Sequence, residues 1–136
     1  MSTTSGRNRL RFDRAEVTEE PTERCRVVVS LALGQLIFQS DAEEAHEGSG
    51  PLKAAAAATL KAVQQAAANR FTCSLSDLDH VNALGKDMIA VLVDVKFEGR
   101  DVQVFGSCQI DGAEIDAAVK AALNATNRFF ELAMRE

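Results

Sequence analysis

The chain has 136 residues, 26% of them charged, and a net charge of −5. This length suits one domain with its own core. The acidic balance argues against a nucleic-acid footprint, which needs clustered Lys and Arg. The sequence lacks the run of about 18 apolar residues that would span a membrane, and its N-terminus lacks a secretory signal. Composition therefore predicts a cytoplasmic globular domain that binds neither nucleic acid nor membrane.

The first half of the chain predicts three strands followed by a helix. Alternating apolar residues predict strands over about 9–17, 25–33 and 36–42, with an acidic loop after the third strand. Pro51 suits the first turn of a helix. The alanine-rich run after it predicts a helix over 54–68, since alanine is the best helix former.

The second half predicts the same order of elements. An irregular alternation predicts a strand over about 71–84, and the clearest alternation in the chain predicts another over 88–97. A glycine-containing hairpin turn leads to a partner strand over 102–110. A helix is predicted over 113–133, with Asp111 as its N-cap.

The two halves also match each other in sequence. Segments 52–62 and 115–125 share paired alanines and a closing leucine at an offset of 63 residues. The hairpins at 29–34 and 94–99 match at an offset of 65. Two similar units can close on each other as a pseudo-symmetric module, and the seam between them is a place where ligands or second subunits bind.

These observations predict an α+β fold of two pseudo-symmetric βββα units, with antiparallel sheets and helices packed on one face. The first unit is expected over about 9–69 and the second over about 70–133, together forming a single domain over 9–133. Residues 1–8 are small and polar, and we expect them to be flexible.

The cysteines and the basic residues suggest no strong site. Cys25, Cys73 and Cys108 form an odd set without paired spacing, which argues against disulfides or a zinc site and favours buried thiols. The only basic cluster consists of four arginines near the start: Arg7, Arg9, Arg11 and Arg14. The cluster is able to bind an anion, but a solvated strand face is the favoured interpretation.

Catalytic and metal-binding arrangements are equally sparse. His80 with Asp77 and Asp79 offers ligands for a divalent cation, and a small enzyme built on these three residues is one alternative. A polar strand edge is the simpler interpretation. The sequence has no phosphate-binding Gly-Lys-Ser/Thr loop and no dinucleotide-binding glycine motif. We therefore expect no cofactor, no metal and no catalytic residues.

One motif does indicate a ligand: Gly48-Ser49-Gly50-Pro51, directly before the first helix. Glycines there expose backbone N–H groups, and the helix dipole favours a carboxylate or phosphate. A simple flexible turn is the alternative. At the matching place of the second unit, Asp111 is able to pair with a ligand ammonium. Together the two loops suggest recognition of an amino acid.

At these residues the chain resembles the C-terminal regulatory (allosteric, dimerisation) domain of 2-isopropylmalate synthase and citramalate synthase. The resemblance rests on the motif from Gly48 to Ala54 and on the valine-rich hairpin from Ala90 to Val104. A glycine turn from Gly106 to Ile115 follows, and then a helix with paired alanines ending in Asn127-Arg128. The resemblance covers about residues 9–130.

The resemblance implies two βββα units, a homodimer, and leucine or isoleucine bound at the seam, where it inhibits a separate catalytic barrel. Carried over by motif, with the neighbouring loop serine included, the ligand-binding residues are Gly48, Ser49, Gly50, Pro51, Ala54, Ile110 and Asp111. With 136 residues there is no room for a catalytic barrel of about 250 residues.

The chain is therefore expected to be a non-enzymatic leucine-sensing type of domain. We expect it to bind a branched-chain amino acid and to act in trans on a synthase or another catalytic partner protein. The alternative is a structural dimerisation module that has lost ligand binding and associates through its sheet or its alanine-rich helices.

Overall fold

The computed structural model describes residues 9–20 and 23–135, in which strands and helices follow one another as two βββα units. The predicted flexible segment 1–8, with Arg7, lies outside these residues. The elements are β1 (Arg11–Glu20), β2 (Arg24–Leu33), β3 (Leu36–Ala45), α2 (Gly50–Ala66), β4 (Thr72–Ala83), β5 (Lys86–Phe97), β6 (Arg100–Gln109) and α3 (Glu114–Ala133).

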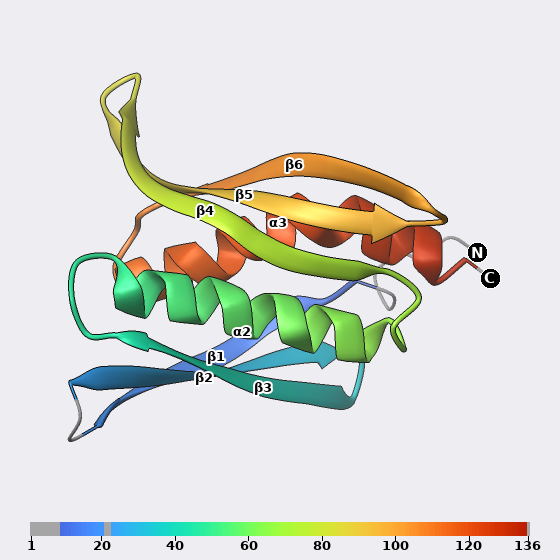
Figure 1. Cartoon of the computed structure of the whole chain (residues 1–136), viewed down its shortest axis with the longest axis horizontal. Coiled ribbons are helices and arrows are strands. Elements are labelled where there is room, and N and C mark those ends of the chain that lie inside the picture. The colour runs from blue at the N-terminus through green and yellow to red at the C-terminus, as the bar shows by residue number, and fades with distance from the viewer. Residues whose placement is uncertain (1–8, 21–22, 136) are drawn as a thin grey trace.

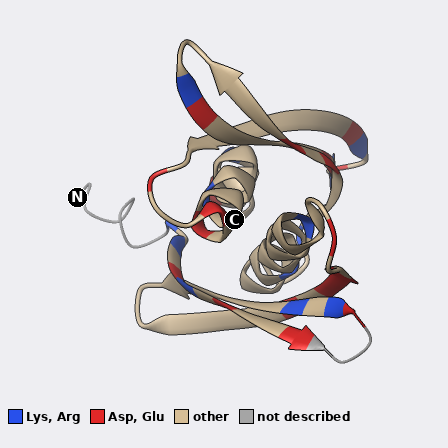
Figure 2. Ribbon diagram, turned by 90° about the vertical axis from the view of Figure 1, so that its left-hand side faces the viewer, with Lys and Arg blue, Asp and Glu red and all other residues tan. Residues whose placement is uncertain are grey.

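The two helices lie between two sheets, as Figures 1 and 2 show. One sheet has the strand order β1-β2-β3 and the other β4-β5-β6, and both are antiparallel. Helix α2 packs on β2, β3 and β4, whereas α3 packs on β5, β6 and β1. The predicted α+β fold, with helices on one face of each sheet, is confirmed. No described helix is long and apolar enough to cross a bilayer.

The helices run in the same direction. Arg70, which follows α2, donates a hydrogen bond of 2.8 Å from its guanidinium to the backbone oxygen of Ala133 at the end of α3. The carbonyl of Ala133 lies in the last turn of α3, where the helix itself offers no N–H donor, so this bond satisfies it. Both helices therefore end at one end of the molecule, and both begin at the other.

Alternation along the central strands fixes which face meets the helices. Val27, Val29 and Leu31 of β2 are buried, and so are Val93 and Val95 of β5, while their neighbours point outward. Side chains of successive strand residues point to opposite faces, so one row of branched side chains from each sheet covers the helix layer.

Small residues let the helices come close to each other and to the sheets. Most buried positions of α2 and α3 are alanines, and the buried hydroxyls of Thr59 and Thr126 bond back to helix carbonyls four residues earlier. Helix α3 and its sheet approach each other closely at Gly106 of β6. A Cβ atom there would lie 2.1 Å from the Ala121 oxygen and 2.7 Å from the Ala125 Cβ.

Three phenylalanines fill the end of the sandwich where the helices end. Phe71 follows α2, Phe97 ends β5, and Phe129 lies in α3. Their ring centroids are 5.9–6.3 Å apart, two of the three pairs being edge-to-face. Edge-to-face contacts are the favoured aromatic geometry. Bulky residues thus close the end where alanines alone would leave space.

The repeat is confirmed, with one correction to its spacing. Ala54, Ala55, Ala58, Leu60 and Ala62 are buried, and so is each residue 63 positions later in α3. The strands, however, repeat at an offset of 64 residues and not at the predicted 65. The cross-strand pair Arg24↔Ala45 of the first unit corresponds to Met88↔Gln109 of the second, and each residue number rises by 64. The prediction aligned two turn glycines, but Gly34 is the first turn residue and Gly99 the second, after Glu98.

Element boundaries also differ from the prediction near the helix starts. Strand β3 continues to Ala45, and α2 begins at Gly50, four residues before the predicted start. Asp111 is not the N-cap of α3. Ala113 holds that position in an extended conformation, without a side-chain cap. The reason is a backbone hydrogen bond from Ile110 to Asp87, which keeps the chain in the sheet and leaves the next residues to cross to the helix.

The close crossing at Gly106 predicts that Gly106→Ala lowers the free energy of unfolding by about 2–3 kcal/mol, because helix backbone has to move. Urea unfolding measures the change. Ser107→Ala, at the exposed neighbouring position, is the matched control and should stay within about 0.5 kcal/mol of wild type. An unchanged stability of Gly106→Ala would show that α3 does not cross β6 this closely.

Burial also predicts the reactivity of the thiols. Desolvation raises the pKa of Cys73 from 9.0 to about 12, and burial raises the pKa of Cys25. Only Cys108 is partly exposed. A thiol reagent at neutral pH should therefore modify one cysteine rapidly and the other two at the rate of unfolding. Cys108→Ser should remove the rapid phase. Rapid modification of all three thiols would contradict the buried positions of Cys25 and Cys73.

Candidate functional site

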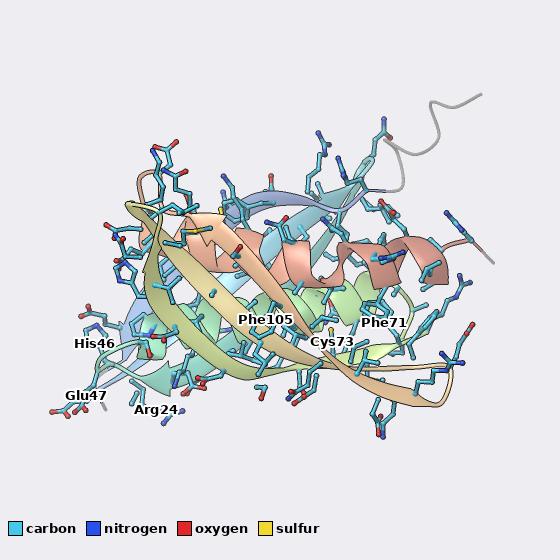
Figure 3. All side chains as sticks on the ribbon, turned by 90° about the horizontal axis from the view of Figure 1, so that it is seen from above. Arg24, His46, Glu47, Phe71, Cys73 and Phe105 are labelled. Atoms are coloured by element: carbon cyan, nitrogen blue, oxygen red, sulfur yellow. The ribbon has the colours of Figure 1, made fainter. Side chains whose placement is uncertain are left out.

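The two loops that carry the predicted ligand residues lie at the same end of the molecule. Each loop leads into one of two helices that pack side by side and begin at that end (Figure 1). Figure 3 shows His46 and Glu47 of the first loop at the end opposite Phe71. The fold therefore brings Gly48, Ser49 and Ile110, Asp111 to one end, although about 60 residues separate them.

Glycine at position 50 is required by the packing of the first loop. A Cβ atom on Gly50 would lie 1.8 Å from the backbone oxygen of Ala45, at the end of β3. The Gly50 N–H donates to the Glu47 oxygen at 2.9 Å. Gly48 has φ +55° and open space around it, so its conformation is what favours glycine there. Ala54, one turn further along, is fully buried.

Few backbone donors remain at the start of α2. The Gly50 N–H is used, Pro51 has none, and the Lys53 N–H donates to the Ser49 oxygen at 2.9 Å. Among the described residues this leaves the N–H of Leu52 without an acceptor. The Ser49 side chain makes no capping hydrogen bond, and no acidic residue lies in the first turn. The start of α2 thus offers one N–H, a hydroxyl and the positive end of the helix dipole.

The start of α3 has the opposite electrostatic character. Glu114 and Asp116 lie in its first turn, and Asp111 is exposed in the loop before it. Ile110 is half-buried and packs against the core. The ring of His80 approaches this cluster, with Nδ1 3.9 Å from a Glu114 carboxylate oxygen. The acids complement the dipole of α3 and give this loop a negative charge, unlike the start of α2.

The alternative cation site at Asp77, Asp79 and His80 does not form. The carboxylates of Asp77 and Asp79 accept hydrogen bonds from the backbone N–H groups of Leu78 and His80, at 2.8 and 3.0 Å. His80 alternates with the two aspartates along β4 and reaches the α3 loop instead. Within residues 9–20 and 23–135, no three His, Cys, Asp or Glu side chains are grouped to hold a metal ion.

A basic groove was not predicted from the sequence. It has a volume of about 520 Å³ and runs between β1 and α3. Its polar and charged lining residues are Arg9, Arg11, Lys120, Asn124 and Asn127. Arg14, from the same arginine cluster, instead pairs with Glu16 at 3.2 Å on the exposed sheet. The sequence did not predict this groove because Lys120 lies more than 100 residues after Arg11, and only the fold brings the two together.

Comparison with protein families agrees with the geometry. The model of the LeuA allosteric (dimerisation) domain matches residues 1–130, which include both βββα units almost entirely and both loops. No individual curated protein matches the sequence. The family match covers nearly the whole chain, and the repeated βββα units are those that the resemblance implied. The chain belongs to the LeuA allosteric (dimerisation) domain family.

Proposed function

We propose that the chain is a non-catalytic regulatory domain that forms a homodimer and binds a branched-chain amino acid at the loops before α2 and α3. It would transmit binding to a separate catalytic partner of the isopropylmalate synthase type. The family supports the regulatory and dimerising role. The observation that carries the ligand proposal is the opposite charge of two helix starts that lie at the same end of the molecule.

An α-amino acid carries one negative and one positive group, and the two loops match them. The start of α2, with the free N–H of Leu52 and the side chain of Lys53, suits the carboxylate. Asp111 and Glu114 suit the ammonium group. Half-buried Leu52 and Ile110 provide an apolar surface for a branched side chain.

Glycines and Pro51 shape this site rather than bind the ligand directly. Gly48 and Gly50 allow the turn and the close contact with β3, and Ala54 lets α2 pack tightly beneath the loop. A ligand held by both loops would couple the first βββα unit to the second. Ligand binding is able to regulate a partner only by favouring one arrangement of these units over another.

The proposal predicts stabilisation by leucine, isoleucine or valine. At a hundredfold excess over Kd, binding adds about 2.7 kcal/mol to the free energy of unfolding, which corresponds to a Tm increase of about 5–10 °C. Ser49→Asp should weaken binding at least about tenfold, because the carboxylate caps α2 and repels the ligand anion. Asp111→Asn should weaken it through loss of the ammonium partner, whereas Asp101→Asn, exposed on a distant hairpin, should not.

Gly50 is not a clean position for this test, since any side chain there would meet the Ala45 oxygen and disturb the fold. Lys120→Glu distinguishes the basic groove: loss of binding in this variant alone would move the ligand site to that groove. If the protein is a dimer and no amino acid raises its Tm, the proposal of ligand binding is wrong. The alternative, a structural dimerisation module, then stands.

A further inference from the structure

The enclosed helices leave the outer sheet faces as the broad surfaces available for dimerisation. α2 and α3 lie between the sheets, so the alanine-rich helices are not free to pair with another chain. The outer face of β1–β3 is crossed by charge pairs: Arg14–Glu16, Arg24–Glu43 and Arg26–Asp41. Exposed charges hold their water strongly, so this face is suited to solvent rather than to burial.

The outer face of β4–β6 is different, because it exposes a large aromatic side chain beside apolar neighbours on the central strand. Phe105 of β6 is 80% exposed and pairs across the strands with Leu92 of β5, which in turn lies opposite Asp77. Figure 3 looks down on this sheet and labels Phe105. A groove of about 230 Å³ on this face is lined by apolar residues together with two carboxylates: Leu78, Val81, Ala90, Val91, Leu92 and Phe105, with Asp77 and Asp79. An exposed phenylalanine beside such a groove is typical of an interaction site.

Charged groups flank the apolar residues on this face. Asp77 and Asp79 of the edge strand β4 line the groove, and their carboxylates accept hydrogen bonds from the backbone N–H groups of Leu78 and His80.

The other charged groups lie towards the β5–β6 turn. Asp94 accepts a hydrogen bond of 2.7 Å from the Gln103 side chain, and Lys96 lies 3.8 Å from Asp101. These groups surround a second groove of about 580 Å³ near the β5–β6 turn. Apolar residues with a polar, internally paired border are the anatomy of a protein–protein interface.

The β4–β5 hairpin projects beyond the sandwich on the side away from the helices (Figure 1). Leu84 at its tip is fully exposed and has φ +55°, next to Gly85 at φ +78°. Turns with two positive φ angles favour asparagine or aspartate at the position of Leu84. Neither solvation nor turn geometry favours leucine there, so burial against a partner is the remaining physical reason for an apolar tip.

We propose that a second copy of this chain docks on the outer face of β4–β6, with Phe105 and Leu92 in the contact and the β4–β5 hairpin reaching over the partner. The inference rests on the homodimer of the proposed function and names its surface. Three strands of 10–12 residues present a face of roughly 35 by 14 Å. This face, which already includes most of the hairpin, is smaller than the roughly 800 Å² per partner of a standard interface, so the dimer is expected to dissociate on dilution.

The test is the oligomeric state of the full chain, measured by analytical ultracentrifugation over a range of concentrations. Phe105→Asp places a charge in the apolar part of the face and should weaken the dimer at least about a hundredfold, without lowering the monomer's Tm, because Phe105 is exposed. Ile37→Asp is the matched control: Ile37 is 55% exposed on the outer face of the other sheet and should leave the dimer unchanged.

A second variant follows the hairpin. Leu84→Asn suits the turn better and should preserve or raise Tm while weakening the dimer several-fold. A wild-type dimer that persists in Phe105→Asp would overturn this interface and leave the proposed homodimer standing. A wild-type monomer at all concentrations would overturn both. Loss of the dimer in Ile37→Asp alone would place the interface on the first sheet.

Discussion

The structure depends on how closely two helices are able to pack between two sheets. Packed helices lie about 8–10 Å apart, depending on the side chains at the contact, and larger residues would push the layers away from each other. Here alanines line both helices, and Gly106 removes even a Cβ atom where α3 crosses β6. Each alanine buries little area, so the stability comes from dense contact between backbones and from the branched side chains of the sheets.

The same constraint explains why the two ends of the molecule differ. At the end where the helices stop, Phe71, Phe97 and Phe129 fill the space and Arg70 satisfies a terminal carbonyl. At the other end both helices begin, and the part of the chain that the structure describes forms no aromatic cluster there. Ligand recognition is proposed at the end with the free helix starts, and the aromatic end serves as the fixed part of the fold.

Much of the fold was predictable from local pattern. The valine alternation of β2 and β5 and the alanine repeat at 63 residues each report which face is buried, and both were confirmed. Turn details were less predictable. A glycine marks a turn without giving its position in it, so Gly34 and Gly99 were aligned wrongly. Asp111 has N-cap chemistry, but the hydrogen bond from Ile110 to Asp87 sets where the helix starts.

The candidate site was predictable in part. The glycine motif and Asp111 pointed to the two loops, but their common location follows from the parallel helices, which no local pattern encodes. The need for Gly50 arises from the Ala45 oxygen, and the basic groove joins Arg11 to Lys120. Such contacts between distant parts of the chain are properties of packing. The difference between the two outer sheet faces became visible only after strand register was known.

Hydrogen exchange of the backbone, measured above and below the concentration at which the protein dissociates, tests most directly whether each chain encloses its own helices. The amides of α2 and α3 should be the most protected at both concentrations, since the sandwich is complete within one chain. Dilution should change protection mainly in the β4–β5 hairpin and the strands next to it. Loss of helix protection on dilution would contradict the enclosed sandwich and would show that the helices themselves form the dimer interface.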